Sequence, residues 1–135
     1  MGYFVEMGDP ESDRYIVRGF ASKSEGSWRW AYADPVLRFW GPNAQSVQFF
    51  MDFAIPERTF RETGPVTLTL SLNGEVFDHV RCDRPGQQHY VHEAPARLFL
   101  KNAMNLVSID PDKFWVAPDD GTKHGFILVR AGFSD

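Results

Sequence analysis

Apolar and polar residues alternate along several short segments of the chain, and this period of two is typical of β-strands with one buried face. The alternation is strictest over residues 47–55, 66–72 and 127–133. It predicts that the following residues face the core: Val47, Phe49, Met51, Phe53 and Ile55; Val66, Leu68, Leu70 and Leu72; and Ile127, Val129, Ala131 and Phe133. Three polar residues on the opposite sides are expected in solvent: Gln48, Asp52 and Arg130.

Five further segments are weaker strand candidates: residues 15–20, 27–32, 36–40, 89–92 and 106–109. Clusters of glycine, proline and asparagine separate the candidates, and we interpret Pro56 with the charged residues 57–62 as one such break. Only residues 95–105 resemble a helix, and they allow no more than one or two turns. About eight short strands with turn signals between them and almost no helix predict an antiparallel β-sandwich or barrel.

The turn after residue 72 decides which side chains of the next strand face the core. A two-residue turn at 73–74 would set Leu70 opposite Phe77, whereas a three-residue loop would set it opposite Val76. We predict the longer loop, at the cost of one inward polar residue, Asp78. That register places three apolar side chains on the inner face: Val76, Val80 and Cys82.

Composition limits the class of protein and of partner. With 135 residues, of which 43% are hydrophobic, the chain is expected to form one domain over 1–135, with 1–13 as an N-terminal arm or first edge strand. The formal charge of −4 gives no basic footprint for nucleic acid. We also expect no membrane insertion, because no apolar run is long enough, and no signal peptide at the N-terminus. The single cysteine excludes an internal disulfide and a cysteine-based zinc site.

Several local signatures occur in a fixed order along the chain. These are "GFASKSEGSWRW" (19–30), "VLRFW" (36–40), a strand ending in Leu72-Asn73-Gly74, "NLVSI" (105–109) and "DGTKHGFILV" (120–129). The order resembles jelly-roll β-sandwich domains, galactose-binding-like in fold, that occur as accessory modules in bacterial glycosyltransferases and other polysaccharide-related proteins. The resemblance covers residues 15–133 and implies a two-sheet jelly roll of non-catalytic type, sometimes carbohydrate-binding and sometimes only architectural.

Residues 27–32 contain the first candidate site. If this segment is extended, Trp28, Trp30 and Tyr32 fall on one face, while Arg29 and Ala31 fall on the other. Two interpretations stay open: the rings are a platform on which a sugar stacks, or they close one end of the core. Solvent exposure distinguishes them, because burial of all four tryptophans, at 28, 30, 40 and 115, would remove the platform.

Residues 110–124 contain the second candidate site. Trp115, Asp120 and His124 are predicted to edge a shallow ligand groove. Together with Arg29, Asp120 and His124 are the side chains we expect to hydrogen-bond sugar hydroxyl groups. Calcium binding by the acidic residues is disfavoured, since Lys113 at the centre of the loop opposes a cation, and we expect no cofactor.

The sequence contains little that supports a catalytic site. Cys82 lies at a core position of its strand, so we interpret it as a small core residue and not as a nucleophile. His89 and His92 have an odd separation on a strand and should face opposite sides, which makes them poor joint metal ligands. No two carboxylates stand out as the acid and base of a glycosidase. We therefore expect that the protein is not an enzyme.

The predicted function is carbohydrate recognition, or support of a glycan-handling partner domain, by a non-catalytic module. The first alternative is an architectural or protein-interaction domain, and the second is a small sugar-active enzyme using Asp120 and His124. The predicted ligand-binding residues are Trp28, Arg29, Trp30, Tyr32, Trp115, Asp120 and His124.

Overall fold

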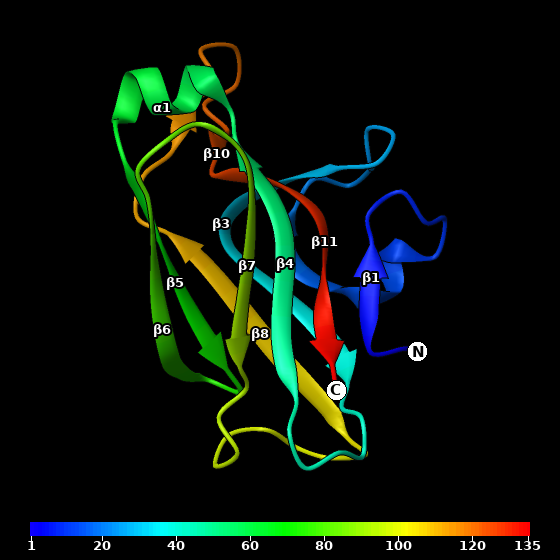
Figure 1. Ribbon diagram of the computed structural model, residues 1–135. Helices are drawn as coiled ribbons and strands as arrows, with labels where there is room; N and C mark the ends of the chain where they lie inside the picture. The colour runs from blue at the N-terminus through cyan, green and yellow to red at the C-terminus, as the bar shows by residue number, and fades with distance from the viewer.

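The computed structural model describes residues 1–135, and nearly all of its regular structure is β-strand (Figure 1). The strands are β1 (Phe4–Glu6), β2 (Ile16–Phe20), β3 (Arg29–Trp40), β4 (Gln48–Ile55), β5 (Val66–Leu72), β6 (Glu75–Cys82), β7 (Gly86–Glu93), β8 (Met104–Pro111), β9 (Trp115–Val116), β10 (Lys123–His124) and β11 (Phe126–Ser134). A 3-10 helix, η1 (Ser12–Tyr15), and one α-helix, α1 (Glu57–Thr63), complete the fold.

Backbone hydrogen bonds join nine strands into one antiparallel sheet in the order β6-β5-β8-β3-β11-β4-β7, with β1 added on β11 and β2 on β3. The sheet curls into two facing layers, of which β7, β4, β11 and β1 form the front one in Figure 1. Strand β3 belongs to both layers, because residues 29–31 pair with β11 and residues 36–40 with β8. The predicted all-β antiparallel sandwich is confirmed, and a shared strand links its layers.

The core lies between the two layers. Every residue that was predicted to face inward on β4 and β5, from Val47 to Leu72, is buried. Phe49 of β4 meets Phe77 of β6 across the interior, with ring centroids 6.4 Å apart, and Phe133 lies 5.8 Å from Phe39. Burial of apolar area on this scale is the main stabilising contribution to such a domain.

Strand β11 departs from the predicted parity over its first half. Phe126 and Leu128 are buried, while Ile127 and Val129, which were predicted in the core, are half-exposed. The pairing with β4 shifts between Leu128 and Arg130, so a β-bulge changes which side chains point inward. Beyond the bulge the predicted inward residues are buried as expected: Ala131 and Phe133.

The hairpin of β5 and β6 adopts neither register considered above. Residues 73–74 form a two-residue turn with φ angles of 52° and 91°, which matches the twist of the flanking strands. A bulge next to Leu70 then sets that residue opposite Asp78. Val76 is consequently 50% exposed, and Phe77 packs against the core in its place. The prediction of the longer loop was wrong.

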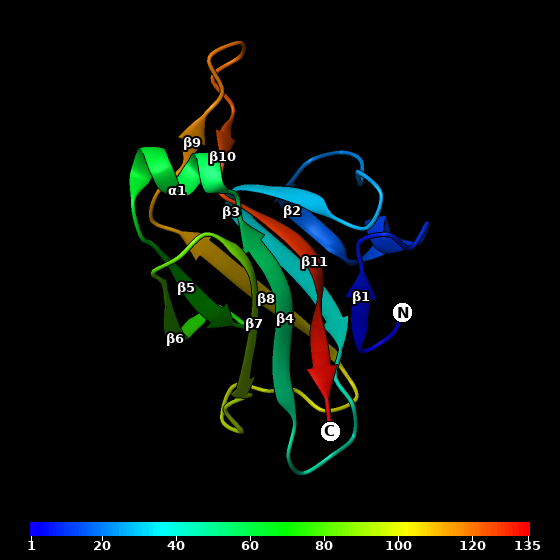
Figure 2. The ribbon, with the colours of Figure 1, turned by 45° about the horizontal axis from the view of Figure 1, so that its top comes forward.

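The helix prediction was also wrong. Residues 95–105 contain turns but no helix, whereas residues 57–63, interpreted as a break, form α1. Pro56, with φ of −59°, precedes the first turn, and Gly64, with φ of 75°, ends the helix. Helix α1 lies at the end of the sandwich beside the hairpin of β9 and β10 (Figure 2). Neither helical segment has the length or apolar character that a membrane crossing requires.

A buried hydrogen-bond network closes the opposite end of the sandwich. The Asn105 side chain is fully buried; its carbonyl accepts from the Leu100 backbone N–H and from the Asn73 amide, each at 2.9 Å. Asn73 also donates to the Leu98 carbonyl and accepts from the Leu106 N–H, both at 2.8 Å. Two of the sequence signatures therefore meet in space, and their asparagines have a structural role.

Candidate functional site

The first half of β3 and the residues just before it display aromatic rings on the outer face of the sheet. Trp28, Trp30 and Tyr32 are half-exposed, while Arg29 and Ala31 point inward and are buried. The predicted parity of this segment is confirmed. Its rings lie outside the hydrophobic core.

The hairpin of β9 and β10 lies beside β3 (Figure 2), and its Trp115 and His124 add two further rings to this surface. The His124 ring centroid lies 4.5 Å from that of Trp30, 5.2 Å from Tyr32 and 5.1 Å from Trp115. Trp28 stands edge-on to Trp30 at 6.0 Å. The two candidate sites, which are separate in the sequence, thus form one aromatic cluster: Trp28, Trp30, Tyr32, Trp115 and His124.

Two contacts fix the position of His124 beside β3, one within its own hairpin and one to β3. Its Nδ1 lies 3.1 Å from the Thr122 carbonyl, which can only accept, so Nδ1 carries the proton. The next residue, Gly125, donates its N–H to the Ala31 carbonyl at 2.8 Å. A Cβ at Gly125 would lie 2.8 Å from Pro111 Cγ, so this close approach requires glycine. The orientation of the central ring of the cluster is therefore set by the backbone.

Asp120 lies on the exposed loop between β9 and β10. Its carboxylate accepts the Thr122 N–H at 2.9 Å, and this hydrogen bond, supported by the nearby His124, lowers the pKa of the carboxyl group. Asp120 is therefore an ionised hydrogen-bond acceptor near the aromatic cluster, as a contact to sugar hydroxyl groups requires.

Arg29 does not belong to this surface. Its side chain points inward and is 4% exposed. It donates to Asp13 Oδ1 at 2.8 Å, to Ser12 Oγ at 3.0 Å and to the Ala21 carbonyl at 2.9 Å. The prediction that Arg29 contacts a ligand was wrong, because the strand parity that turns the rings outward turns Arg29 inward. It fastens η1 and the loop after β2 to β3.

Three arginines form no hydrogen bond or ion pair through their guanidinium groups: Arg58, Arg61 and Arg84. The first two line a cavity of about 410 Å³ together with Glu62 and Trp115. The guanidinium carbon of Arg58 lies 5.1 Å from the centroid of the Trp115 ring, in cation–π geometry. Free donors thus extend the aromatic cluster towards α1.

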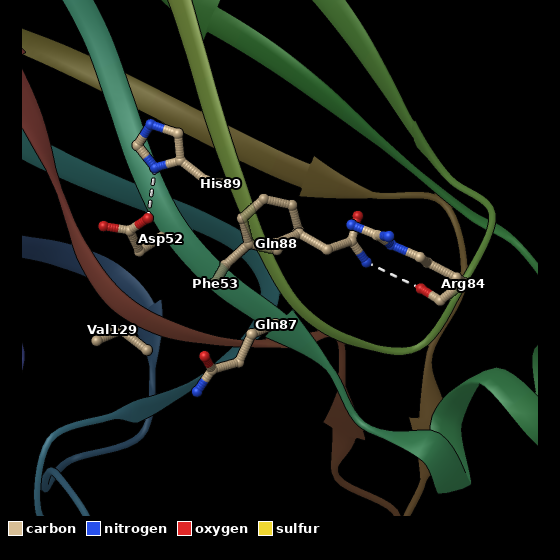
Figure 3. Close-up of a pocket in the computed structure, with 7 residues that line it drawn as sticks. All are labelled: Asp52, Phe53, Arg84, Gln87, Gln88, His89 and Val129. Carbon is tan, nitrogen blue, oxygen red and sulfur yellow. Dashed lines mark hydrogen bonds and ion pairs between the residues drawn. The ribbon is translucent and has the colours of Figure 1, made fainter.

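A second cavity, of about 510 Å³, lies on the outer face of β11, β4 and β7 (Figure 3). Asp52 and His89 face each other there, with Oδ1 and Nδ1 2.5 Å apart, and Arg130 Nε lies 2.9 Å from the other carboxylate oxygen. Arg84, Gln87 and Gln88 complete the polar lining. Sequence reasoning missed this cavity, and its only trace was the outward parity of Asp52 and Arg130.

The remaining reactive groups have structural surroundings. Cys82 is buried, as predicted; burial, with the charges of Asp83 and Asp112, raises the pKa of its thiol to about 11, so the thiolate is scarce at neutral pH. His89 and His92 lie on opposite faces of β7, as their odd separation predicted. The structure contains no group of three or more His, Cys, Asp or Glu side chains that could hold a metal ion.

Comparison of the sequence with protein-family models and with curated proteins gives no match. The fold recurs in solved structures. One is a Paenibacillus sp. cycloisomaltooligosaccharide glucanotransferase complexed with cycloisomaltoheptaose, at 12% identity and a TM-score of 0.54 over 98% of this chain and 18% of that one. Another is an exo-β-1,3-galactanase from Phanerochaete chrysosporium with β-1,3-galactotriose, at 14% identity and a TM-score of 0.52 over 98% of this chain and 29% of that one.

This chain has the fold of a β-sandwich found in carbohydrate-active enzymes. At such low identity the similarity concerns the fold alone. The chain spans less than a third of either protein, so their activities belong to much longer chains.

Proposed function

We propose that this chain is a non-catalytic module that binds carbohydrate through the aromatic cluster. The observation that carries the proposal is the placement of the rings: Trp28, Trp30 and Trp115 are only half-buried and lie outside the hydrophobic core. Rings that merely closed the core would be buried. Exposed rings with hydrogen-bonding groups near them suit a sugar, whose C–H face is apolar and whose edge carries hydroxyl groups. The fold that the chain shares with domains of sugar-bound enzymes supports this function.

Each member of the site has a chemical role in this proposal. Four rings, Trp28, Trp30, Tyr32 and Trp115, offer stacking surfaces, and their packing on one another and on His124 fixes their orientation before a ligand arrives. Asp120 accepts hydrogen bonds from sugar hydroxyl groups. His124 adds its Nε2, and Arg58 supplies the donors that the sequence had assigned to Arg29.

A binding role suits this site better than hydrolysis. Glycosidases need a carboxylic acid that stays protonated near neutral pH, together with a second, ionised carboxylate across the scissile bond. The pKa of Asp120 is shifted downward, in the direction opposite to that of a general acid. Release of reducing sugar by the wild type, abolished by Asp120→Asn, would contradict the non-catalytic proposal.

A glycan array followed by titration calorimetry tests the proposal. We expect the wild type to bind at least one carbohydrate and Trp30→Ala to lose at least tenfold in affinity while remaining folded. Trp40→Ala is the matched control, because Trp40 is a comparably exposed tryptophan whose segment of β3 pairs with β8 in the other layer. Folded wild-type protein that binds no carbohydrate, or Trp30→Ala that binds as the wild type does, would contradict it.

A second candidate function is support of a glycan-handling domain, such as the glycosyltransferases that the resemblance implies. An apolar strip on the outer face of β3 and β8 favours it, because Trp40 pairs with Met104 and Leu106 follows on the same side. These three side chains are 37%, 36% and 44% exposed, and exposed apolar patches mark interfaces. Weaker association of Leu106→Lys with a neighbouring domain, with sugar binding retained, would support this function.

A further inference from the structure

We infer that the Asp52–His89 cavity is a second subsite for the glycan that the aromatic cluster binds, so that the ligand is an extended oligosaccharide lying across β11, β4 and β7. The inference rests on the proposed function and adds the class of ligand. It starts from the positions of the two sites on one sheet face.

Strand register places the two sites in one row. Trp30 pairs with Ile127, Ile127 with Ala54, and Ala54 with Gln87, across four adjacent strands. None of these side chains is buried in the core, because their neighbours along each strand take the inward positions. Three strand spacings amount to roughly 14 Å. One sugar ring cannot reach from Trp30 to Gln87, but a short chain of rings can.

The surface between the two sites is shaped for such a chain. Ile127 and Ala54 form a floor of modest apolar side chains between the tryptophans and Gln87. Next to this floor, the bulge in β11 turns Val129 outward, where it lines the cavity. Bulges commonly re-aim a side chain beside a binding site. The irregularity that broke the predicted parity of β11 therefore builds one wall of the second subsite.

The cavity offers hydrogen-bonding groups that the protein itself does not use. His89 directs Nδ1 at Asp52, which leaves its Nε2 free for a ligand. The guanidinium group of Arg84 and the amide of Gln87 have no protein partner, and both line the cavity. Arg130 holds Asp52 in place from the other side.

The placement of the unpaired arginines strengthens the inference. Every arginine elsewhere in the chain pairs with a carboxylate or a carbonyl, as Arg18 pairs with Asp34 at 2.9 Å. The exceptions line the two cavities, one beside Trp115 and one beside His89. Donors and acceptors gathered in a hollow suit the hydroxyl groups of a sugar unit. The absence of exposed tryptophan there indicates a subsite that hydrogen-bonds and does not stack.

The test measures affinity against chain length. Isomalto-oligosaccharides and β-1,3-galacto-oligosaccharides, each from disaccharide to hexasaccharide, are titrated into the wild type and into Arg84→Ala combined with Gln87→Ala. We expect wild-type affinity to rise with length, and the double variant to lose about tenfold for the longer members while binding the disaccharide unchanged. Gln48→Ala is the control, because Gln48 is exposed on β4 but does not line the cavity.

The outcomes separate the two proposals. A double variant that binds long oligosaccharides as the wild type does would overturn the second subsite and leave the aromatic cluster as the binding site. Wild-type affinity that is independent of length would overturn it too, as would wild-type protein that binds neither series. The proposed function itself fails if the glycan array is empty, if Trp30→Ala has no effect, or if the wild type releases reducing sugar in a reaction that Asp120→Asn abolishes.

Discussion

The two ends of the sandwich differ in how far their side chains are satisfied by contacts within the protein. At one end, the buried Asn105 amide and Asn73 satisfy one another and the backbone of the adjoining loops. At the other end, the rings around His124 pack on each other but stay half-exposed, and Arg58 has no polar partner. An end whose polar groups are all satisfied internally contributes stability. An end with exposed rings and free donors keeps interactions available for a ligand.

The largest expected effect is on the closed end. Asn105→Ala removes a side chain that serves several backbone groups, and each buried group left unsatisfied costs about 1–3 kcal/mol, so we expect a loss of roughly 4 kcal/mol in the free energy of unfolding. Urea denaturation measures this loss. Asn43→Ala, at an exposed loop position, is the control and should change the free energy of unfolding by less than about 0.5 kcal/mol. Equal effects of the two substitutions would remove the distinction between the ends.

Arg29 tests whether the aromatic end contains a buried polar anchor of its own. Arg29→Ala leaves the Ser12 hydroxyl and the Ala21 carbonyl without their donor, and we expect a loss of about 2 kcal/mol in the free energy of unfolding. The loss should be smaller than for Asn105→Ala because Asp13 is largely exposed and can be hydrated. Arg29→Lys should recover part of the stability. If Arg29→Ala lost sugar binding with unchanged stability, Arg29 would be a ligand-binding residue and not a structural one.

Substitution of Trp30 should affect sugar binding strongly and stability less than substitution of Asn105 does. Because the ring is only half-buried, Trp30→Ala should lower the free energy of unfolding by about 2 kcal/mol, while sugar binding is lost. Thermal denaturation alongside calorimetric titration measures both quantities on one sample. A loss of stability as large as that of Asn105→Ala would mean that the ring belongs to the core.

The smallest effect is on alkaline stability. The unfolded Cys82 thiol loses its proton near pH 9.0, whereas the folded one keeps it until about pH 11, so stability should fall as the pH rises between these values. Burial and the hydrogen bond to Asp78 also raise the pKa of Tyr90, which adds to the fall. Cys82→Ala should flatten the dependence measured by urea denaturation. A wild-type profile that does not fall across this range would contradict the raised pKa values.

The predictable part of the fold is the part where side chains alternate without interruption. The inward residues of β4 and β5 follow from the sequence because neither strand contains a bulge: β4 pairs with β7, and β5 with β8, without a shift in register. The bulges beside Leu70 and Leu128 place one extra residue on β6 and on β11, respectively, and alternation alone contains no sign of them. Helix α1 was not predicted from the sequence because few of its residues are buried, so no apolar periodicity marks it. Pro56 before a charged turn was the one start signal.

The candidate site likewise has a part that the sequence predicts and a part that it does not. Parity within one strand placed Trp28, Trp30 and Tyr32 on a common face, since that requires only local geometry. The union of these rings with His124 depends on contacts between segments about 90 residues apart, which no local pattern encodes. The Asp52–His89 pair likewise depends on the register of β4 with β7. Outward polar residues on two predicted strands were the only signal that could have suggested it.

Strand β3 makes the display of the rings inseparable from folding. In the first half of β3, Arg29 and Ala31 point inward and are buried, whereas Trp30 and Tyr32 face out. Inserting a single residue between Trp30 and Ala31 would turn the tryptophan into the interior or expel Ala31 from it. Mutational drift that preserves a foldable chain therefore preserves the orientation of the rings, and only the identity of the outward residues is free to change.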